Sequence, residues 1–109
     1  MSVIKRFIDA VENKDEATIK ELVCDDYKFF IHIDNKVLFK SDLIGWCMSD
    51  SFTRSRSRII YENDEIGVEH TFVTFANGTT PEAVLSVHRI VDGKIISTET
   101  GATALHEYG

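Results

Sequence analysis

The stretch that decides the fold is residues 86–104, SVHRIVDGKIISTETGATA. Two runs rich in valine and isoleucine flank Asp92 and Gly93, a pattern typical of two antiparallel strands joined by a tight turn. On a solvated sheet face, polar residues within such strands carry little information, but on the inner face of a curved sheet they would line a pocket. The polar residues in question are Ser86, His88, Thr98 and Thr100.

The turn decides which face these polar residues share. A three-residue loop, with Gly93 in the left-handed conformation of a G1 bulge, places Ser86 beside Thr98, and it puts all four polar residues on one face. A two-residue loop would shift the register by one and turn the side chains of one strand to the opposite face. We therefore expect the bulged turn.

Length and composition indicate one domain, residues 1–109, of which 43% are apolar. The formal net charge is -6, from 18 acidic and 12 basic side chains, which argues against nucleic acid as the main partner. No run approaches the roughly 18 apolar residues of a membrane span, and the N-terminus is too polar for a secretory signal. A cytoplasmic location without membrane contact is the expectation.

The first half of the chain predicts three helices interrupted by one hairpin. Apolar residues recur at helical spacing near residues 4–11, 19–23 and 43–48, whereas YKFFIHI (27–33) and KVLF (36–39) favour strands. The second half predicts a four-stranded antiparallel meander, with strands at 53–61 and 66–75, a third strand opened by Pro81, and a fourth that follows Asp92-Gly93. Helices segregated from strands in this way predict an α+β fold.

This order of elements resembles the nuclear transport factor 2-like superfamily and its SnoaL-like proteins. The resemblance rests on RFIDAVENKDEATIKELVCDDYKFFIHI (6–33) and on HRIVDGKII (88–96). It implies a cone-shaped, curved mixed sheet wrapped around three N-terminal helices, a cystatin-like roll with a pocket at its open end. Because members are often homodimers, it also implies that the chain pairs with itself.

The catalytic residues of known members are absent from the matching positions. Positions that carry the ketosteroid isomerase set hold Phe7, Ile31 and Ser86. Positions of the limonene-epoxide hydrolase set hold His70, Phe72 and Thr100. A pair of histidines, His70 and His88, is similar to the scytalone dehydratase pair in residue type only. The resemblance therefore leaves open whether the chain is an enzyme.

The resemblance and the preferred turn together predict a pocket for a small apolar molecule. We expect Val68, His70 and Phe72 to share the inner face of their strand, and Glu69, Glu99 and His32 to point away from it. The expected pocket residues combine apolar walls with a few polar groups. They are Phe7, Trp46, His70, Phe72, Val84, Ser86, His88, Thr98 and Thr100.

Two roles stay open for the histidines. His70 and His88 are the best catalytic candidates, because imidazole titrates near neutral pH and serves as an acid or a base. The alternative is that each is a buried side chain satisfied by a Ser or Thr partner. Trp46 is similarly either a core residue or a platform for a ligand.

The remaining polar signals have structural interpretations. Arg54, Arg56 and Arg58 alternate on a predicted strand, so one face would carry all three and pair with nearby acids; a nucleic-acid motif is the alternative. The two cysteines, Cys24 and Cys47, share no metal-binding spacing, and we expect two free thiols. Neither a metal nor a cofactor is expected.

Two functions follow from these observations. The first is an isomerase, dehydratase or cyclase acting on an apolar substrate through a pocket histidine. The second is a non-catalytic, dimeric binding or scaffold protein of the same fold. In either case we expect a homodimer through the outer sheet face, on which the predicted register places an apolar set. That set is Val73, Leu85, Val87 and Ile95.

Overall fold

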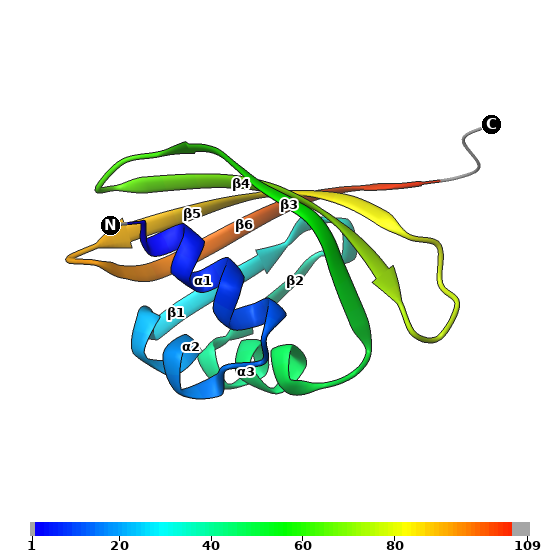
Figure 1. Ribbon diagram of the computed structural model, residues 1–109, viewed down its shortest axis with the longest axis horizontal. Coiled ribbons are helices and arrows are strands. Elements are labelled where there is room, and N and C mark those ends of the chain that lie inside the picture. The colour runs from blue at the N-terminus through cyan, green and yellow to red at the C-terminus, as the bar shows by residue number, and fades with distance from the viewer. Residues whose placement is uncertain (1, 106–109) are drawn as a thin grey trace.

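A computed structural model describes residues 2–105 of the chain, in which three helices lie on one side of a single six-stranded sheet (Figure 1). The expected α+β class is confirmed. The helices are α1 (Val3–Glu12), α2 (Glu16–Leu22) and α3 (Lys40–Met48), and a short 3-10 helix spans His32–Asp34. The strands are β1 (Val23–Ile31), β2 (Lys36–Phe39), β3 (Phe52–Glu62), β4 (Ile66–Phe75), β5 (Glu82–Val91) and β6 (Lys94–Ala104).

The strand order is β2-β1-β6-β5-β4-β3. Strands β3 to β6 form the predicted antiparallel meander, and β1 joins it in parallel beside β6. The sheet is therefore mixed, as the resemblance implied. No helix among the described residues is long and apolar enough to cross a membrane.

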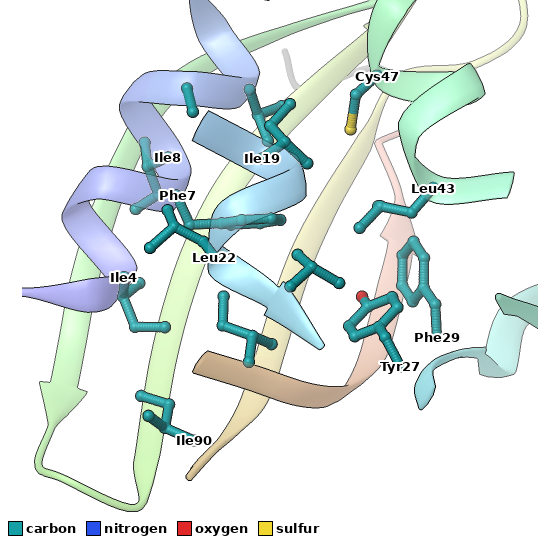
Figure 2. Close-up of a cluster of buried hydrophobic side chains, with 14 residues drawn as sticks. Ile4, Phe7, Ile8, Ile19, Leu22, Tyr27, Phe29, Leu43, Cys47 and Ile90 are labelled. Atoms are coloured by element: carbon teal, nitrogen blue, oxygen red, sulfur yellow. The ribbon is translucent and has the colours of Figure 1, made fainter. Parts of the chain in front are cut away.

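The core forms where the helices meet the inner face of the sheet. In α1 the Ser2 side chain accepts a hydrogen bond from the Lys5 N–H at the N-terminus, and the apolar stripe that follows turns towards the sheet. Figure 2 shows this stripe, Ile4, Phe7 and Ile8, against side chains from α2, β1, α3 and β5. The labelled partners are Ile19, Leu22, Tyr27, Phe29, Leu43, Cys47 and Ile90.

The β5–β6 turn differs from the prediction. Asp92 and Gly93 both have positive φ, 52° and 78°, so the loop has two residues rather than three. A bulge lies further along, where the register changes between the pairs Ile90–Ile95 and Arg89–Ser97. His88 therefore lies opposite Thr98, and the predicted pairing of Ser86 with Thr98 is wrong. The bulge nonetheless returns the four polar residues to one face.

On β4 the predicted faces are inverted. Gly67, Glu69, Thr71 and Val73 are buried under the helices, and the alternate residues lie on the outer face of the sheet. Gly67 shows why, because a Cβ there would lie 2.2 Å from the Cγ1 atom of Ile4 in α1. Only the face with no side chain at position 67 can receive this helix so closely.

Strand β3 also departs from simple alternation. Arg54 pairs with the inward-facing Val73 and Arg58 with the outward-facing His70, with a register change between them. Arg56 lies at this irregularity with φ of 52°. The expectation that Arg54, Arg56 and Arg58 share one face is therefore wrong, because the bulge changes the parity of the strand.

Candidate functional site

A cavity of about 350 Å³ lies between the helices and the inner face of the sheet. Its volume is within the range of small-molecule sites, roughly 300–1,000 Å³. Most of its wall is apolar and comes from α1, α3 and all six strands of the sheet. The apolar wall includes Phe7, Val11, Phe29, Leu43, Trp46, Phe52, Val73 and Val84.

The two ends of the cavity differ in polarity and exposure. Asp34 and Lys36 line it and are exposed, so the mouth lies near the β1–β2 hairpin. Glu82 lines the same end, and its pKa is raised by burial and by the negative charge of Asp34. The inner end is formed by polar groups that are almost completely buried.

The centre of this inner end is a pair of side chains, Glu69 from β4 and His88 from β5. They are 1% and 2% exposed. The His88 Nε2 atom lies 2.5 Å from Glu69 Oε2, and its Nδ1 atom lies 2.7 Å from Thr98 Oγ1 on β6. Phe7 covers the imidazole ring edge-on, with the ring centroids 5.4 Å apart. The imidazole is thus held on both nitrogens and sealed by an aromatic ring.

Arg54 from β3 completes the group by donating a hydrogen bond to the other carboxylate oxygen of Glu69. Burial alone would raise the pKa of Glu69. The hydrogen bond from His88 and the positive charge of Arg54 outweigh that effect and hold the pKa below its usual value. Glu69 is therefore an ionised carboxylate inside an apolar cavity.

The hydrogen bonds run in one direction. Because the Glu69 carboxylate only accepts, the His88 Nε2–H donates to it. In the neutral ring Nδ1 then accepts from the Thr98 hydroxyl. Burial raises the pKa of Tyr27, which also lines the cavity, well above its ordinary value, so its hydroxyl keeps its proton. Two hydrogen bonds in the same direction thus lead from Thr98 through His88 to Glu69.

The structure brings seven of the nine predicted pocket residues to this cavity. Trp46 on α3 lines the wall and stacks on Phe52 with ring centroids 4.0 Å apart. The Thr100 hydroxyl donates to the Phe30 carbonyl oxygen on the neighbouring strand. The seven residues are Phe7, Trp46, Val84, Ser86, His88, Thr98 and Thr100.

The predicted placement of His70 and Phe72 is wrong. Both lie on the outer face of β4, because they alternate with Gly67, Glu69, Thr71 and Val73, which lie under the helices. Their rings meet edge-on, 5.1 Å apart, and Arg56 stacks over Phe72 at 4.1 Å. His70 pairs across the strands with Leu85, and its Nδ1 atom is buried without a hydrogen-bond partner among the described residues.

Of the two glutamates predicted to point away from the pocket, Glu69 and Glu99, only one does so. Glu99 does so, and its carboxylate meets the exposed His32 at 3.1 Å. Glu69 faces inward, and the prediction for it is wrong. Sequence reasoning missed Glu69, and it assigned Arg54 only a structural role. Gly67 was the available signal, since a strand glycine marks a close approach of another backbone and so identifies the covered face that Glu69 shares.

Within residues 2–105, no three His, Cys, Asp or Glu side chains are grouped so as to hold a metal ion. Both cysteines are free thiols, and Cys47 lines the cavity, where burial raises its pKa to about 11. The polar chemistry that the described residues offer is hydrogen bonding and proton transfer.

No family model and no curated protein matches the chain. Solved structures do match. A candidate ketosteroid isomerase from Kribbella flavida DSM 17836 has a TM-score of 0.80 at 10% identity, over 98% of this chain and 79% of that one. An NTF2-like protein of unknown function from Cytophaga hutchinsonii ATCC 33406 has a TM-score of 0.76 at 13% identity, over 93% and 87%. An LEH-like epoxide hydrolase from M. tuberculosis has a TM-score of 0.70 at 12% identity, over 93% and 80%.

These likenesses show that the chain has the nuclear transport factor 2-like (NTF2-like) fold, the fold that the sequence resemblance implied. Proteins with this fold include isomerases, epoxide hydrolases, cyclases and proteins of unknown function. The fold alone therefore selects no activity, and the function has to be argued from the cavity.

Proposed function

We propose that this protein binds a small, mostly apolar molecule in the cavity and transfers a proton on it, with Glu69 and His88 as the acid–base pair. The observation that carries the proposal is the buried chain Arg54–Glu69–His88–Thr98 at the inner end of an apolar-walled cavity. Buried titratable groups with perturbed pKa values are concentrated at functional sites, since burial otherwise costs stability.

The proposed chemistry matches what the pair can do. Glu69 is ionised and can accept a proton from a bound molecule. His88 steadies that carboxylate through its Nε2–H and has Thr98 and Tyr27 behind it as further hydrogen-bonding groups. A proton accepted at one atom of the ligand and returned at another is an isomerisation. If the same proton is instead given to a hydroxyl group that leaves as water while a C=C bond forms, the reaction is a dehydration and Glu69 is again ionised. Both reaction types remain within this proposal.

A non-catalytic binding protein is the second candidate. It is favoured by one observation: both ring nitrogens of His88 already have protein partners. A base whose hydrogen bonds are satisfied is also what a purely structural cluster looks like. The two candidates predict the same binding and differ in proton transfer.

The experiment uses 2-tetralone, an uncharged bicyclic ketone with exchangeable α-protons. Binding is followed by the fluorescence of Trp46, which is the single tryptophan and lines the cavity. Proton transfer is followed as α-proton exchange in D₂O by NMR. We expect saturable binding, and exchange that falls roughly a hundredfold in His88→Gln, the usual scale of an acid–base group.

The matched control is His32→Gln, which alters the exposed His32–Glu99 pair on the outer surface and should leave both readouts unchanged. Saturable binding with exchange no faster than in buffer would support the non-catalytic candidate. Absence of any saturable quenching would overturn the proposed function as a whole.

A further inference from the structure

Arg54 has hydrogen-bond donors that no described residue uses. A guanidinium carries five N–H groups, and this one donates a single side-chain hydrogen bond, to Glu69. The only side-chain atom in the described part that is both sealed from solvent and unpartnered is His70 Nδ1. The Arg54 side chain is 9% exposed and lines the cavity, so a molecule bound in the cavity can supply an acceptor for the N–H groups that Glu69 does not use.

The charge of Arg54 is already balanced. Glu69 accepts from it directly, and the second oxygen of Glu69 is held by His88. Cys47, across the cavity on α3, is a neutral thiol. With a neutral His88 ring, the positive charge of Arg54 and the negative charge of Glu69 therefore cancel at the inner end of the cavity. Several N–H donors of Arg54 nevertheless remain unused.

We propose that Arg54 is the residue that recognises the ligand, and that it selects an uncharged oxygen acceptor, such as a ketone, aldehyde or ester, in preference to a carboxylate. This inference rests on the proposed function, which it extends by naming the ligand class of the same cavity. Arg54 acts here as a specificity residue, and the acid–base roles stay with the Glu69–His88 pair.

Two physical arguments exclude the alternatives. A ligand carboxylate would bring a second negative charge close to Glu69 in an apolar cavity, where charge repulsion is strong and desolvation is costly. A hydrocarbon of the same shape would fill the cavity but leave the N–H groups of Arg54 without an acceptor and without water. An uncharged carbonyl oxygen satisfies the donors without adding charge.

The test uses three probes of the same shape: 2-acetylnaphthalene, 2-naphthoate and 2-isopropenylnaphthalene. They carry, at the same position, a ketone, a carboxylate and an alkene. Dissociation constants are measured at pH 7.5 by quenching of Trp46. We expect the wild-type protein to bind the ketone roughly ten- to hundredfold more tightly than either of the others, as one hydrogen bond to a charged group implies.

Two variants separate the charge from the donors. In Glu69→Gln the charge of Arg54 is no longer balanced. We therefore expect the affinity for 2-naphthoate, relative to the affinity for the ketone, to rise at least about tenfold over the wild-type ratio. In the double variant with Arg54→Met and Glu69→Gln both charges are gone together. There we expect the ketone to lose its advantage over the alkene.

The wild-type comparison decides the inference even if a variant fails to fold. Equal binding of ketone and alkene, or binding of 2-naphthoate as tight as that of the ketone, would overturn it while leaving cavity binding established. If none of the three probes bound, the proposed function would fall, and this inference with it.

Discussion

Glu69 is a charged side chain at one of the least accessible positions in the protein. Its pKa lies below the ordinary 4.5, because His88 and Arg54 together outweigh the effect of burial. A carboxyl whose pKa is lower in the folded than in the unfolded state stabilises the folded state above the unfolded pKa. That contribution is lost as the pH falls through the folded pKa.

We therefore expect the free energy of unfolding to fall steeply below about pH 4.5, partly because of Glu69. Glu69→Gln cannot titrate, so its stability should fall less steeply over the same range, from a value roughly 2 kcal/mol lower at pH 7. Urea unfolding of both proteins between pH 3 and 7 measures the two curves. Parallel curves would show that Glu69 binds the same number of protons in both states.

Cys47 gives a second prediction for a single residue. Its pKa is raised to about 11, mainly by burial, so at pH 8 the thiol carries its proton, and the thiolate is the reactive form. Cys24 is partly exposed. We expect a disulfide reagent at pH 8 to modify Cys24 roughly a hundredfold faster than Cys47, and to find two thiols after unfolding in denaturant. Equal rates in the native protein, or fewer than two thiols after unfolding, would contradict this.

Among the elements, the contact between α1 and β4 sets the position of the site. Gly67 on β4 lies against Ile4 and pairs with His88 on β5, while Phe7 on the same helix covers the His88 ring. An added methyl group at position 67 would collide with Ile4 unless the helix moved. A shift of α1 that relieves a collision at Gly67 would therefore also move Phe7 relative to the His88 ring.

Gly67→Ala should accordingly lower stability by about 1–3 kcal/mol, the usual cost of overpacking, and weaken 2-tetralone binding. Gly101→Ala is the matched control, because a Cβ at this exposed position on β6 meets nothing within 4 Å. Thermal unfolding and Trp46 quenching provide the two readouts. If the Gly67→Ala protein were as stable as the Gly101→Ala protein, α1 would be able to move away from β4 without lowering the free energy of unfolding.

Some of the elements could be predicted from the sequence, and others could not. The helices and the meander follow from periodicity and turn residues, which act locally. The polar face of β5 and β6 was predicted through the wrong turn, and it depends on the bulge between Arg89 and Ile90. Glu69 and Arg54 could not be placed in this way. On β4 both faces carry apolar residues, so alternation cannot say which is covered, and on β3 the bulge at Arg56 has no sequence signature. Which face of β4 is covered, and which way Arg54 points on β3, are both decided by contacts with residues that are distant in the sequence.

At the scale of the whole molecule, the outer face of the sheet carries a set of apolar side chains that no helix covers. The predicted set is half right, since Leu85 and Val87 lie on this face while Val73 and Ile95 are buried under the helices. Val68 and Phe72 join them across β4. Leu85 is 42% exposed, and a contiguous apolar face of this kind usually marks an interface.

The charges beside this face favour a second copy of the same chain as the partner. Arg56 and Arg58 lie on β3 at one edge, and Glu99 lies on the outer face of β6, with β4 and β5 between them. A two-fold axis parallel to the strands, placed between β4 and β5, would bring β3 of each copy over β6 of the other. The strand registers place Arg58 level with Gly101, two residues from Glu99, so an arginine of each copy would lie near a glutamate of the other, around an apolar centre, as a self-complementary interface requires.

We therefore expect the protein to sediment as a dimer at micromolar concentration, and Leu85→Arg to weaken the dimer at least about tenfold, because it places a charge at the apolar centre. Val37→Arg is the control, since Val37 is similarly exposed, at 47%, but lies on β2 at the opposite edge of the sheet from β3. Leu85 contacts solvent in the single chain, so its replacement should leave the thermal unfolding of the monomer nearly unchanged. Sedimentation equilibrium of the three proteins distinguishes the cases. A monomeric wild-type protein would exclude this interface, and a dimer that both arginine variants leave intact would place the contact on another surface.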